Sequence, residues 1–122
     1  MPIFTLLYVE SVARSVAFYR ALLGIEPLEE HPCTFASFPL SEGAFLGLWD
    51  ATGVEPAPSG SGARTELCFA VSDRAALEAR FAAWTAAGAE VAQELSAMDF
   101  GDTFTVTDPD GHRLRVMVPR EG

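Results

Sequence analysis

The sequence has no lysine. All eight of its basic residues are arginine, against seventeen acidic residues, and the formal net charge is −9. A chain of this balance lacks the basic stripe that displaces counterions from phosphates, so nucleic acid is not an expected partner. Long hydrophobic runs are also missing. None reaches the ~18 residues that a membrane-spanning helix needs, so a membrane is not an expected partner either.

Cysteine is scarce as well. Cys33 and Cys68 are too few for a disulfide framework, and two free thiols suit a reducing compartment. The first ten residues lack the basic flank and the cleavage site of a secretory signal peptide. We therefore expect a cytoplasmic protein. A hydrophobic content of 49% in 122 residues is sufficient for one folded domain with an ordinary core.

The clearest local pattern lies near the end of the chain. Asp108-Pro109-Asp110-Gly111 predicts a turn, because proline presets φ at the first corner and glycine adopts a left-handed conformation without strain. After the turn, apolar residues alternate with polar or long ones, which is the period of a half-buried strand. The apolar set is Leu114, Val116 and Val118, and the alternate set is Arg113, Arg115 and Met117. We predict a β-hairpin that ends in a strand with one apolar and one mixed face.

The same order of elements is predicted twice. The first copy has a strand at 4–9, a helix from the N-cap Ser11 to Gly24, and strands at 25–30, 34–40 and 45–49. The second has a strand at 66–71, a helix that begins at Ser72 or Asp73 and ends at Gly88, strands at 89–94 and 103–107, and the strand after the turn. Residues 51–64 have the composition of a linker. We predict a single domain over residues 1–122, with βαβββ modules at 1–50 and 65–122.

Two stretches carry a resemblance to a known family. LYVESVARSVAFYRALLG, at residues 7–24, and FTVTDPDGHRLRV, at 104–116, together resemble the vicinal-oxygen-chelate superfamily. This superfamily contains glyoxalase I, extradiol dioxygenases and bleomycin-resistance proteins. The resemblance implies an α+β fold in which two βαβββ modules form a curved mixed sheet, with a concave ligand cavity and helices on the convex side. It also implies a homodimer, which the open edges of such sheets favour independently.

The resemblance implies ligand positions that this chain does not fill. Metal-dependent members take their ligands from four equivalent strand positions, which here are Phe4, Gly47, Glu66 and Arg115. Phenylalanine and glycine offer no donor, and arginine would repel a divalent ion. Glu66 alone falls short of the about three protein ligands of a catalytic metal site. We therefore expect no metal and no other cofactor, as in the metal-free drug-binding resistance members of the family.

Side-chain parity predicts which residues line the cavity. If the aliphatic face of each strand packs against the helices, the concave face holds aromatic residues from the first module and charged residues from the second. Stacking on aromatic rings holds a planar ligand, and polar groups orient it. Gly47, beside Trp49, is expected to leave space for such a ligand, and a loop with Met98 and Phe100 is expected over the cavity mouth. The predicted ligand-binding residues are Tyr8, Phe45, Trp49, Glu66, Met98, Phe100 and Arg115.

Several alternatives stay open at this level. Trp49 could lie in the core or in a dimer interface, the loop at Met98 could be a dimer contact, and Glu66 could simply neutralise Arg115. The favoured function is metal-independent binding of a small planar aromatic compound, as in antibiotic resistance by sequestration.

The first alternative function is a glyoxalase-like lyase or isomerase. Glu66 would be its general base, Tyr8 its proton donor, and Arg115 would stabilise an oxyanion. The second alternative is a regulatory or accessory dimer whose hollow is filled by its own side chains.

Overall fold

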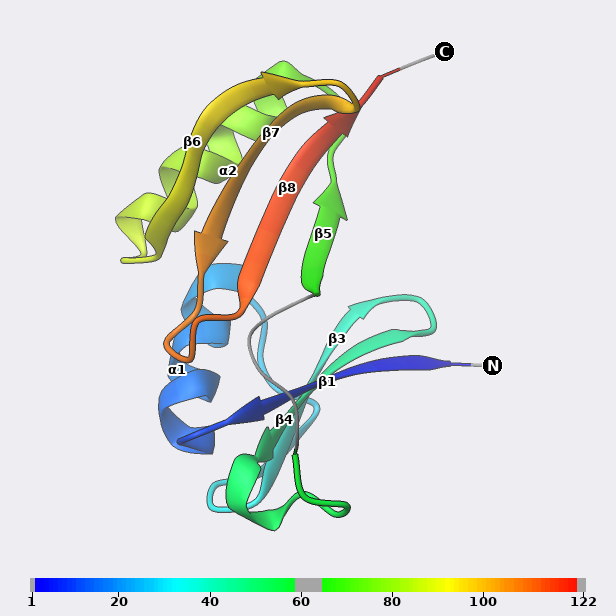
Figure 1. Cartoon of the computed structure of the whole chain (residues 1–122), viewed down its shortest axis with the longest axis vertical. Helices are drawn as coiled ribbons and strands as arrows, with labels where there is room; N and C mark the ends of the chain where they lie inside the picture. Colours follow the sequence, from blue (N-terminus) through cyan, green and yellow to red (C-terminus); the bar gives the residue numbers. More distant parts are fainter. Residues whose placement is uncertain (1, 59–64, 121–122) are drawn as a thin grey trace. The chain divides into compact units, whose positions relative to one another are not determined.

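The computed structural model describes residues 2–58 and 65–120. The chain divides into two compact units, Met1–Ser61 and Gly62–Gly122, and each unit has a strand, a helix and three further strands in that order (Figure 1). The division falls within the predicted linker 51–64, of which residues 59–64 lie outside the described part of the chain. The linker begins with a 3₁₀ helix, Ala51–Gly53, which is capped by Asp50.

Unit 1 is a four-stranded mixed sheet with one helix. It consists of β1 (Ile3–Val9), α1 (Val12–Leu23), β2 (Glu29–His31), β3 (Phe35–Ser41) and β4 (Ala44–Asp50). The strand order is β1-β4-β3-β2, with β1 parallel to β4 and the other neighbours antiparallel. The prediction of a strand at 25–30 was wrong at its start. Pro27 has no N–H to donate to β3, so the ladder of β2 begins only after it.

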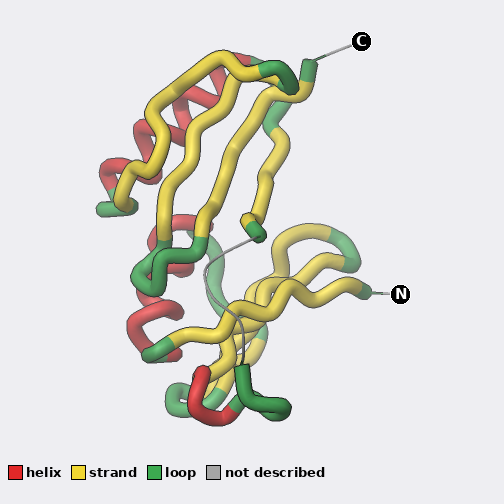
Figure 2. The backbone as a smooth tube through the Cα atoms, viewed as in Figure 1, coloured by secondary structure: helices red, strands yellow, loops and turns green. Residues whose placement is uncertain are grey.

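Unit 2 repeats this topology. It consists of β5 (Glu66–Ala70), α2 (Arg74–Ala86), β6 (Glu90–Met98), β7 (Gly101–Thr107) and β8 (Arg113–Pro119), in the order β5-β8-β7-β6. In each unit the helix covers one face of the sheet and leaves the other face open (Figure 2). β6 continues to Met98 rather than stopping at residue 94, and its register with β7 shifts on both sides of Gln93. Such irregularities break the alternation from which strands are predicted.

The predicted N-caps and the predicted end of the first helix are confirmed, whereas the C-cap of α2 is Ala87, one residue before the predicted Gly88. The Oγ of Ser11 accepts a hydrogen bond from the backbone N–H of Arg14 at 3.1 Å, and α1 ends at Gly24, whose φ of 68° is left-handed. Of the two candidates for the second cap, Asp73 is the one used: its Oδ1 accepts from the N–H of Ala76 at 2.8 Å. Among the described residues, no helix is long and apolar enough to cross a membrane.

The buried faces of both sheets are those that parity predicts. Leu46 and Leu48 of β4 and Leu114 and Val116 of β8 have no exposed surface. In unit 2 the ring of Phe104 is also fully buried, and its centroid lies 5.1 Å from that of Phe81 and 5.6 Å from that of Trp84. These side chains form the contact between each sheet and its helix. The remaining alternate residues of the strands lie on the open faces.

The turn between β7 and β8 is braced by the buried carboxylate of Asp108. Its Oδ1 accepts hydrogen bonds from the N–H groups of Asp110 at 2.9 Å and His112 at 2.8 Å, and its Oδ2 lies 2.7 Å from Nδ1 of His112. Asp108, Asp110 and His112 bring possible metal-ligand atoms within 4.8 Å of one another. Because the Asp108 carboxylate already binds the turn's own backbone and imidazole, we assign this cluster to the turn and not to a metal.

We expect this turn to contribute less to stability as pH rises. The hydrogen bond to Asp108 raises the pKa of His112; burial lowers it, and the charges of Asp108 and Asp110 raise it further. A histidine whose pKa is higher in the folded state contributes stability that is complete below its unfolded pKa and is lost as pH rises through its folded pKa. His112→Asn should remove this dependence from urea unfolding midpoints measured from about pH 5 to about pH 9. His31→Asn, at the exposed end of β2, is the control. Equal pH dependence in wild type and His112→Asn would contradict the expectation.

Candidate functional site

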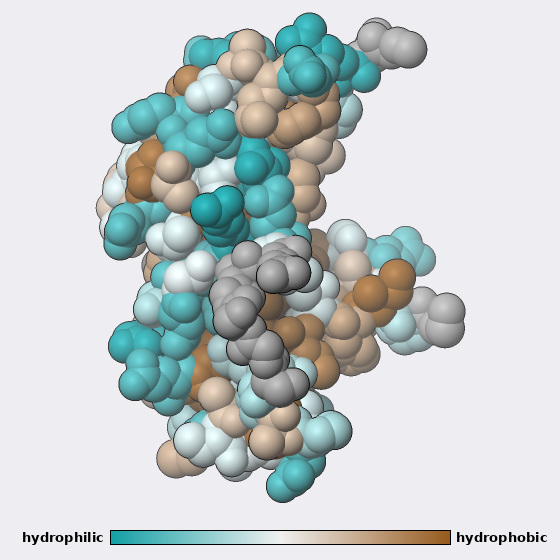
Figure 3. Space-filling model, in the orientation of Figure 1, coloured by the Kyte–Doolittle hydropathy of each residue, from teal (hydrophilic) through white to brown (hydrophobic). Residues whose placement is uncertain are grey.

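On the open face of the unit 1 sheet, β1 and β4 carry the aromatic side chains that we call the aromatic cluster: Phe4, Tyr8, Phe45 and Trp49. In the parallel register of β1 and β4, Phe4 lies beside Phe45 and Tyr8 beside Trp49. Phe4 and Phe45 stack with centroids 4.8 Å apart, whereas Tyr8 and Trp49 meet edge to face at 6.2 Å and 83°. Phe4 and Tyr8 are 52% and 43% exposed. Hydrophobic residues accordingly reach the surface near the N-terminal end of β1 (Figure 3).

The expectation of open space at Gly47 was wrong. A Cβ atom at this glycine would lie 2.5 Å from Cδ2 of Leu6 and 3.1 Å from Cε1 of Phe35. These residues belong to β1 and β3, the strands on either side of β4, and their side chains lean over the glycine. Gly47 therefore allows its neighbours to close over β4. The surface that a ligand could contact in unit 1 is that of the exposed rings.

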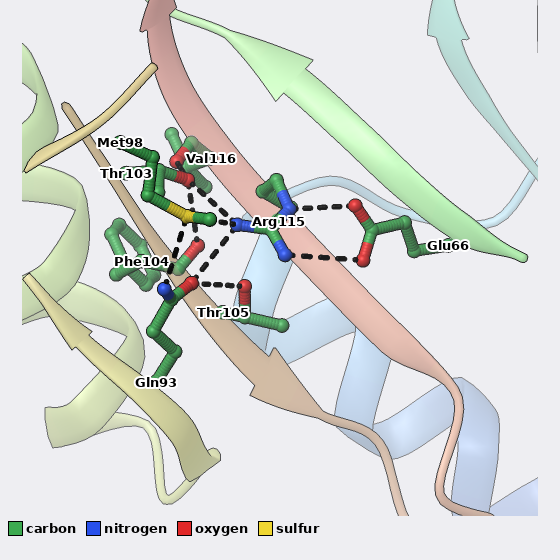
Figure 4. A network of polar contacts seen from close by, with 8 residues as sticks. All are labelled: Glu66, Gln93, Met98, Thr103, Phe104, Thr105, Arg115 and Val116. Carbon is green, nitrogen blue, oxygen red and sulfur yellow. Dashed lines mark hydrogen bonds and ion pairs between the residues drawn. The ribbon is translucent and has the colours of Figure 1, made fainter. Parts of the chain in front are cut away.

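The open face of the unit 2 sheet carries a polar network centred on Arg115 of β8 (Figure 4). The Nε of Arg115 lies 2.6 Å from Oε1 of Glu66 on β5, and its Nη2 lies 3.5 Å from Oε2 of the same carboxylate. On the other side, Nη1 donates to Oε1 of Gln93 at 2.9 Å and to Oγ1 of Thr103 at 3.3 Å. We call these residues the Arg115 network. Glu66 and Arg115 therefore pair with each other, which was one of the two alternatives left open.

Met98 and Phe100 flank this network. Met98 ends β6, and its Sδ lies 3.2 Å from Nε2 of Gln93 and 3.9 Å from Nη1 of Arg115. The centroid of the Phe100 ring lies 5.6 Å from Cζ of Arg115, within the range of a cation–π contact. The predicted loop is thus a tight hairpin between β6 and β7 that packs beside Arg115. Four of the predicted ligand-binding residues meet in unit 2, and the other three belong to the aromatic cluster of unit 1.

The neutral residues Gln93 and Thr103 of the network, and Thr105 beside them, were not among the predicted ligand-binding residues. Thr103 and Thr105 alternate with the buried Phe104, and Thr105 lies opposite Arg115 in the register of β7 and β8, so parity could have found them. Gln93 gave no such signal, because the register shifts on both sides of it break the alternation of β6. Its carboxamide oxygen accepts from Arg115 and, at 3.2 Å, from Oγ1 of Thr105.

Cys68 lies beside Arg115 in the register of β5 and β8. Burial raises the pKa of its thiol, the negative charge of Glu66 raises it further, and the positive charge of Arg115 lowers it. A raised pKa keeps the sulfur protonated at neutral pH. The thiolate is the nucleophilic form of cysteine, so this environment does not prepare Cys68 for nucleophilic attack.

Comparison with known proteins identifies the family. The model of the Glyoxalase/Bleomycin resistance protein/Dioxygenase superfamily matches residues 3–116. The chain belongs to this superfamily. One relative is the phenazine antibiotic resistance protein EhpR of Enterobacter agglomerans, which is 32% identical over 118 residues, or 94% of this chain and 89% of that protein.

Two solved structures share the fold. A solution NMR structure of an Agrobacterium tumefaciens protein is 45% identical, has a TM-score of 0.86, and is matched over 99% of this chain and 98% of that one. A glyoxalase-related enzyme from Fulvimarina pelagi has a TM-score of 0.83 over 97% of this chain and 87% of that one, but only 20% identity. The second likeness shows the fold alone. The two βαβββ units described above are thus the glyoxalase/bleomycin resistance fold.

The positions that hold a metal in metal-dependent members of the superfamily do not fit one here. Leu6 and Phe35 close over Gly47, and the ring of Phe4 stacks on Phe45. In unit 2 the carboxylate of Glu66 is already paired with Arg115, whose Nε lies 2.6 Å from Oε1. A ligand set with one carboxylate and a permanent cation does not suit a divalent ion.

Proposed function

We propose that this protein binds a small planar aromatic compound, without a metal and without transforming it, as a resistance protein that sequesters an antibiotic. The proposal is based mainly on the aromatic cluster, whose rings are partly exposed on the open face of the sheet. Contiguous apolar patches are seldom exposed on a protein surface unless they bind something. The likeness to a phenazine resistance protein adds support, since phenazine is a planar tricyclic aromatic. In this proposal the cluster supplies the stacking surface.

A glyoxalase-like lyase or isomerase is the alternative, and it has less support. Its general base would be Glu66, yet both oxygens of that carboxylate contact Arg115. These contacts orient the carboxylate toward Arg115, whereas a general base must be oriented toward the proton that it removes. Its proton donor would be Tyr8, which packs edge-on against Trp49 in the aromatic cluster.

Metal content and the chemical fate of the ligand test this proposal. We expect elemental analysis of the purified protein to find no stoichiometric divalent metal, and a chelator to leave the unfolding midpoint unchanged, because the family's ligand positions do not suit a metal. Prolonged incubation with phenazine should return the compound unaltered by mass spectrometry. About one zinc, nickel, manganese or iron ion per chain would overturn the metal-independent reading, and a stoichiometric product would favour the enzyme.

We also propose a homodimer. β1 is an edge strand of its sheet, and it exposes Ile3, Phe4 and Leu6 at 65%, 52% and 43%. Exposed apolar edges promote association unless another strand or chain covers them. Sedimentation equilibrium should therefore give twice the chain mass at micromolar concentration. Ile3→Lys, which places a charge on that edge, should shift the equilibrium toward monomer. A wild-type monomer under the same conditions would contradict the proposal.

We also propose that the protein is located in the cytoplasm. Cys33 and Cys68 are both free and exposed. A reducing compartment keeps exposed thiols in that state.

A further inference from the structure

Met98 places its thioether sulfur beside hydrogen-bond donors on the open face of unit 2. Its Sδ lies 3.2 Å from Nε2 of Gln93 and 3.9 Å from Nη1 of Arg115 (Figure 4). A thioether sulfur is only a weak acceptor, so it satisfies these donors poorly. Met98 is also 37% exposed, whereas methionine side chains commonly fill gaps in a core. Packing alone therefore does not account for a methionine at this position.

The orientation of the Gln93 carboxamide is set by its other neighbours. Arg115 has only N–H groups, so the atom that faces its Nη1 at 2.9 Å must be the acceptor oxygen, Oε1. The Oγ1 of Thr105 donates to the same oxygen at 3.2 Å. The Nε2 of Gln93, with its two hydrogens, therefore faces Met98, and this assignment does not depend on the sulfur.

The backbone of Met98 is held in place next to these donors. Met98 pairs with Gly101 at the end of the ladder between β6 and β7. Nη2 and Nε of Arg120 donate to its carbonyl oxygen at 3.0 Å and 3.3 Å. All of these residues belong to unit 2. A chemical change at the sulfur would therefore act within one unit, on donors that are already positioned around it.

A hydroperoxide would convert this sulfur into a better acceptor. A lone pair of Sδ attacks one oxygen of hydrogen peroxide and the O–O bond breaks. The departing hydroxide then takes the proton from the oxygen on sulfur and leaves as water. The sulfur loses two electrons, the peroxide gains them, and the product is a polar sulfoxide. Its oxygen would accept from Nε2 of Gln93 and would form a charge-assisted hydrogen bond with Arg115, in competition with the 3.3 Å contact to Thr103.

We propose that Met98 is a site of oxidative modification by hydroperoxides, and that Gln93 and Arg115 bind the oxygen of the resulting sulfoxide. The other methionine in the described part of the chain, Met117, is half-buried on β8, so it presents less surface to a peroxide. The inference does not rest on the proposed function. It concerns a reaction of unit 2 itself, whether or not the protein binds an aromatic compound.

Peptide mass spectrometry after limited treatment with hydrogen peroxide tests the site. We expect Met98 to be oxidised at least about 5-fold faster than Met117, because it is the more exposed of the two. A thiol reductant added afterwards removes reversible oxidation of the two cysteines.

Stability distinguishes a bound sulfoxide oxygen from one that is merely exposed to water. A sulfoxide in water should leave the unfolding equilibrium unchanged. One that accepts from Gln93 and Arg115 should lower the equilibrium constant for unfolding in urea by about 2-fold to 10-fold, the range of one net hydrogen bond. Methionine sulfoxide reductases specific for each epimer should reverse the change. Met98→Leu keeps Met117 and both cysteines, so it is the matched control and should show no change.

Gln93→Glu identifies the donor. Glutamate keeps the shape of the side chain and the oxygen that Arg115 and Thr105 contact, but it replaces the NH₂ group that faces Met98 with a second acceptor. Oxidation of this variant should give no gain in stability, because two oxygens would face each other. The oxidised and unoxidised forms of the same variant are compared, so the cost of the substitution itself cancels.

The outcomes decide the inference in either direction. Faster oxidation of Met98, with a gain in stability that Met98→Leu and Gln93→Glu both lack, supports it. Oxidation of Met117 at the same rate would overturn it, as would unchanged or reduced stability of the oxidised wild type. A gain in Gln93→Glu as large as in wild type would also overturn it.

Discussion

Trp49→Ala is expected to weaken the binding of a planar aromatic ligand by about 2–4 kcal/mol, which is the range of an aromatic anchor. This corresponds to a dissociation constant about 30-fold to 1,000-fold higher. Trp49 is half-buried on the open face of unit 1, and its ring plane is nearly perpendicular to that of Tyr8. The two rings therefore do not stack on each other, and the proposed function has a planar ligand stack on one of them. Stacking contributes about 0.5–1.5 kcal/mol beyond the buried area, and the lost area accounts for the rest.

The sequence supplies a matched control for this experiment. The chain has two tryptophans, and the other, Trp84, is buried behind the sheet of unit 2. Trp84→Phe should change stability and leave ligand affinity nearly unchanged, and it makes Trp49 the single fluorescent indole. A phenazine titration should quench Trp84→Phe strongly and Trp49→Ala weakly. Quenching of Trp49→Ala as strong as wild type, at the same concentration, would show that the ligand does not touch Trp49, and Tyr8 and Phe45 would become the candidates.

Phe104→Ala is expected to lower the free energy of unfolding by about 3–5 kcal/mol, the usual cost of removing a buried phenylalanine side chain. Its ring has no exposed surface and meets Phe81 and Trp84 edge to face, at interplanar angles of 76° and 84°. These contacts join β7 to α2. Alanine would leave a cavity that the surrounding residues could fill only in part.

The same substitution at an exposed site is the control. Phe4 is 52% exposed on β1, so Phe4→Ala should cost less than about 1.5 kcal/mol. Urea unfolding followed by far-ultraviolet circular dichroism gives both values. A loss at Phe4 as large as that at Phe104 would mean that the open face of unit 1 is packed as tightly as the core of unit 2, contrary to the structure.

The parts of the fold that depend on residues close together in the sequence could be predicted. Ser11 and Gly24 bound a helix because a hydroxyl can accept from the first turn and glycine can adopt a left-handed conformation after the last. Alternation placed Leu114 and Val116 in the core and Arg115 on the opposite face, since side chains in a strand point to alternate sides.

The details that depend on contacts between strands could not be predicted. Gly47 was expected beside open space, but Leu6 and Phe35 from the adjoining strands occupy it. Gln93 joins the Arg115 network through an irregular register that no alternation reveals. Parity placed Glu66 and Arg115 on the same face, yet whether they would bind each other depended on how their long side chains lie. The sequence therefore predicted which face of each sheet carries the residues of the candidate site. It did not predict how the side chains on that face contact one another.

Calorimetric titration with phenazine, before and after the protein is dialysed against a chelator, tests the central claim most directly. Metal-independent binding to aromatic side chains predicts saturable binding with the same dissociation constant in both samples, and unaltered phenazine when the complex is extracted. Binding that disappears after dialysis and returns with a divalent cation would contradict the claim, as would no binding in either sample.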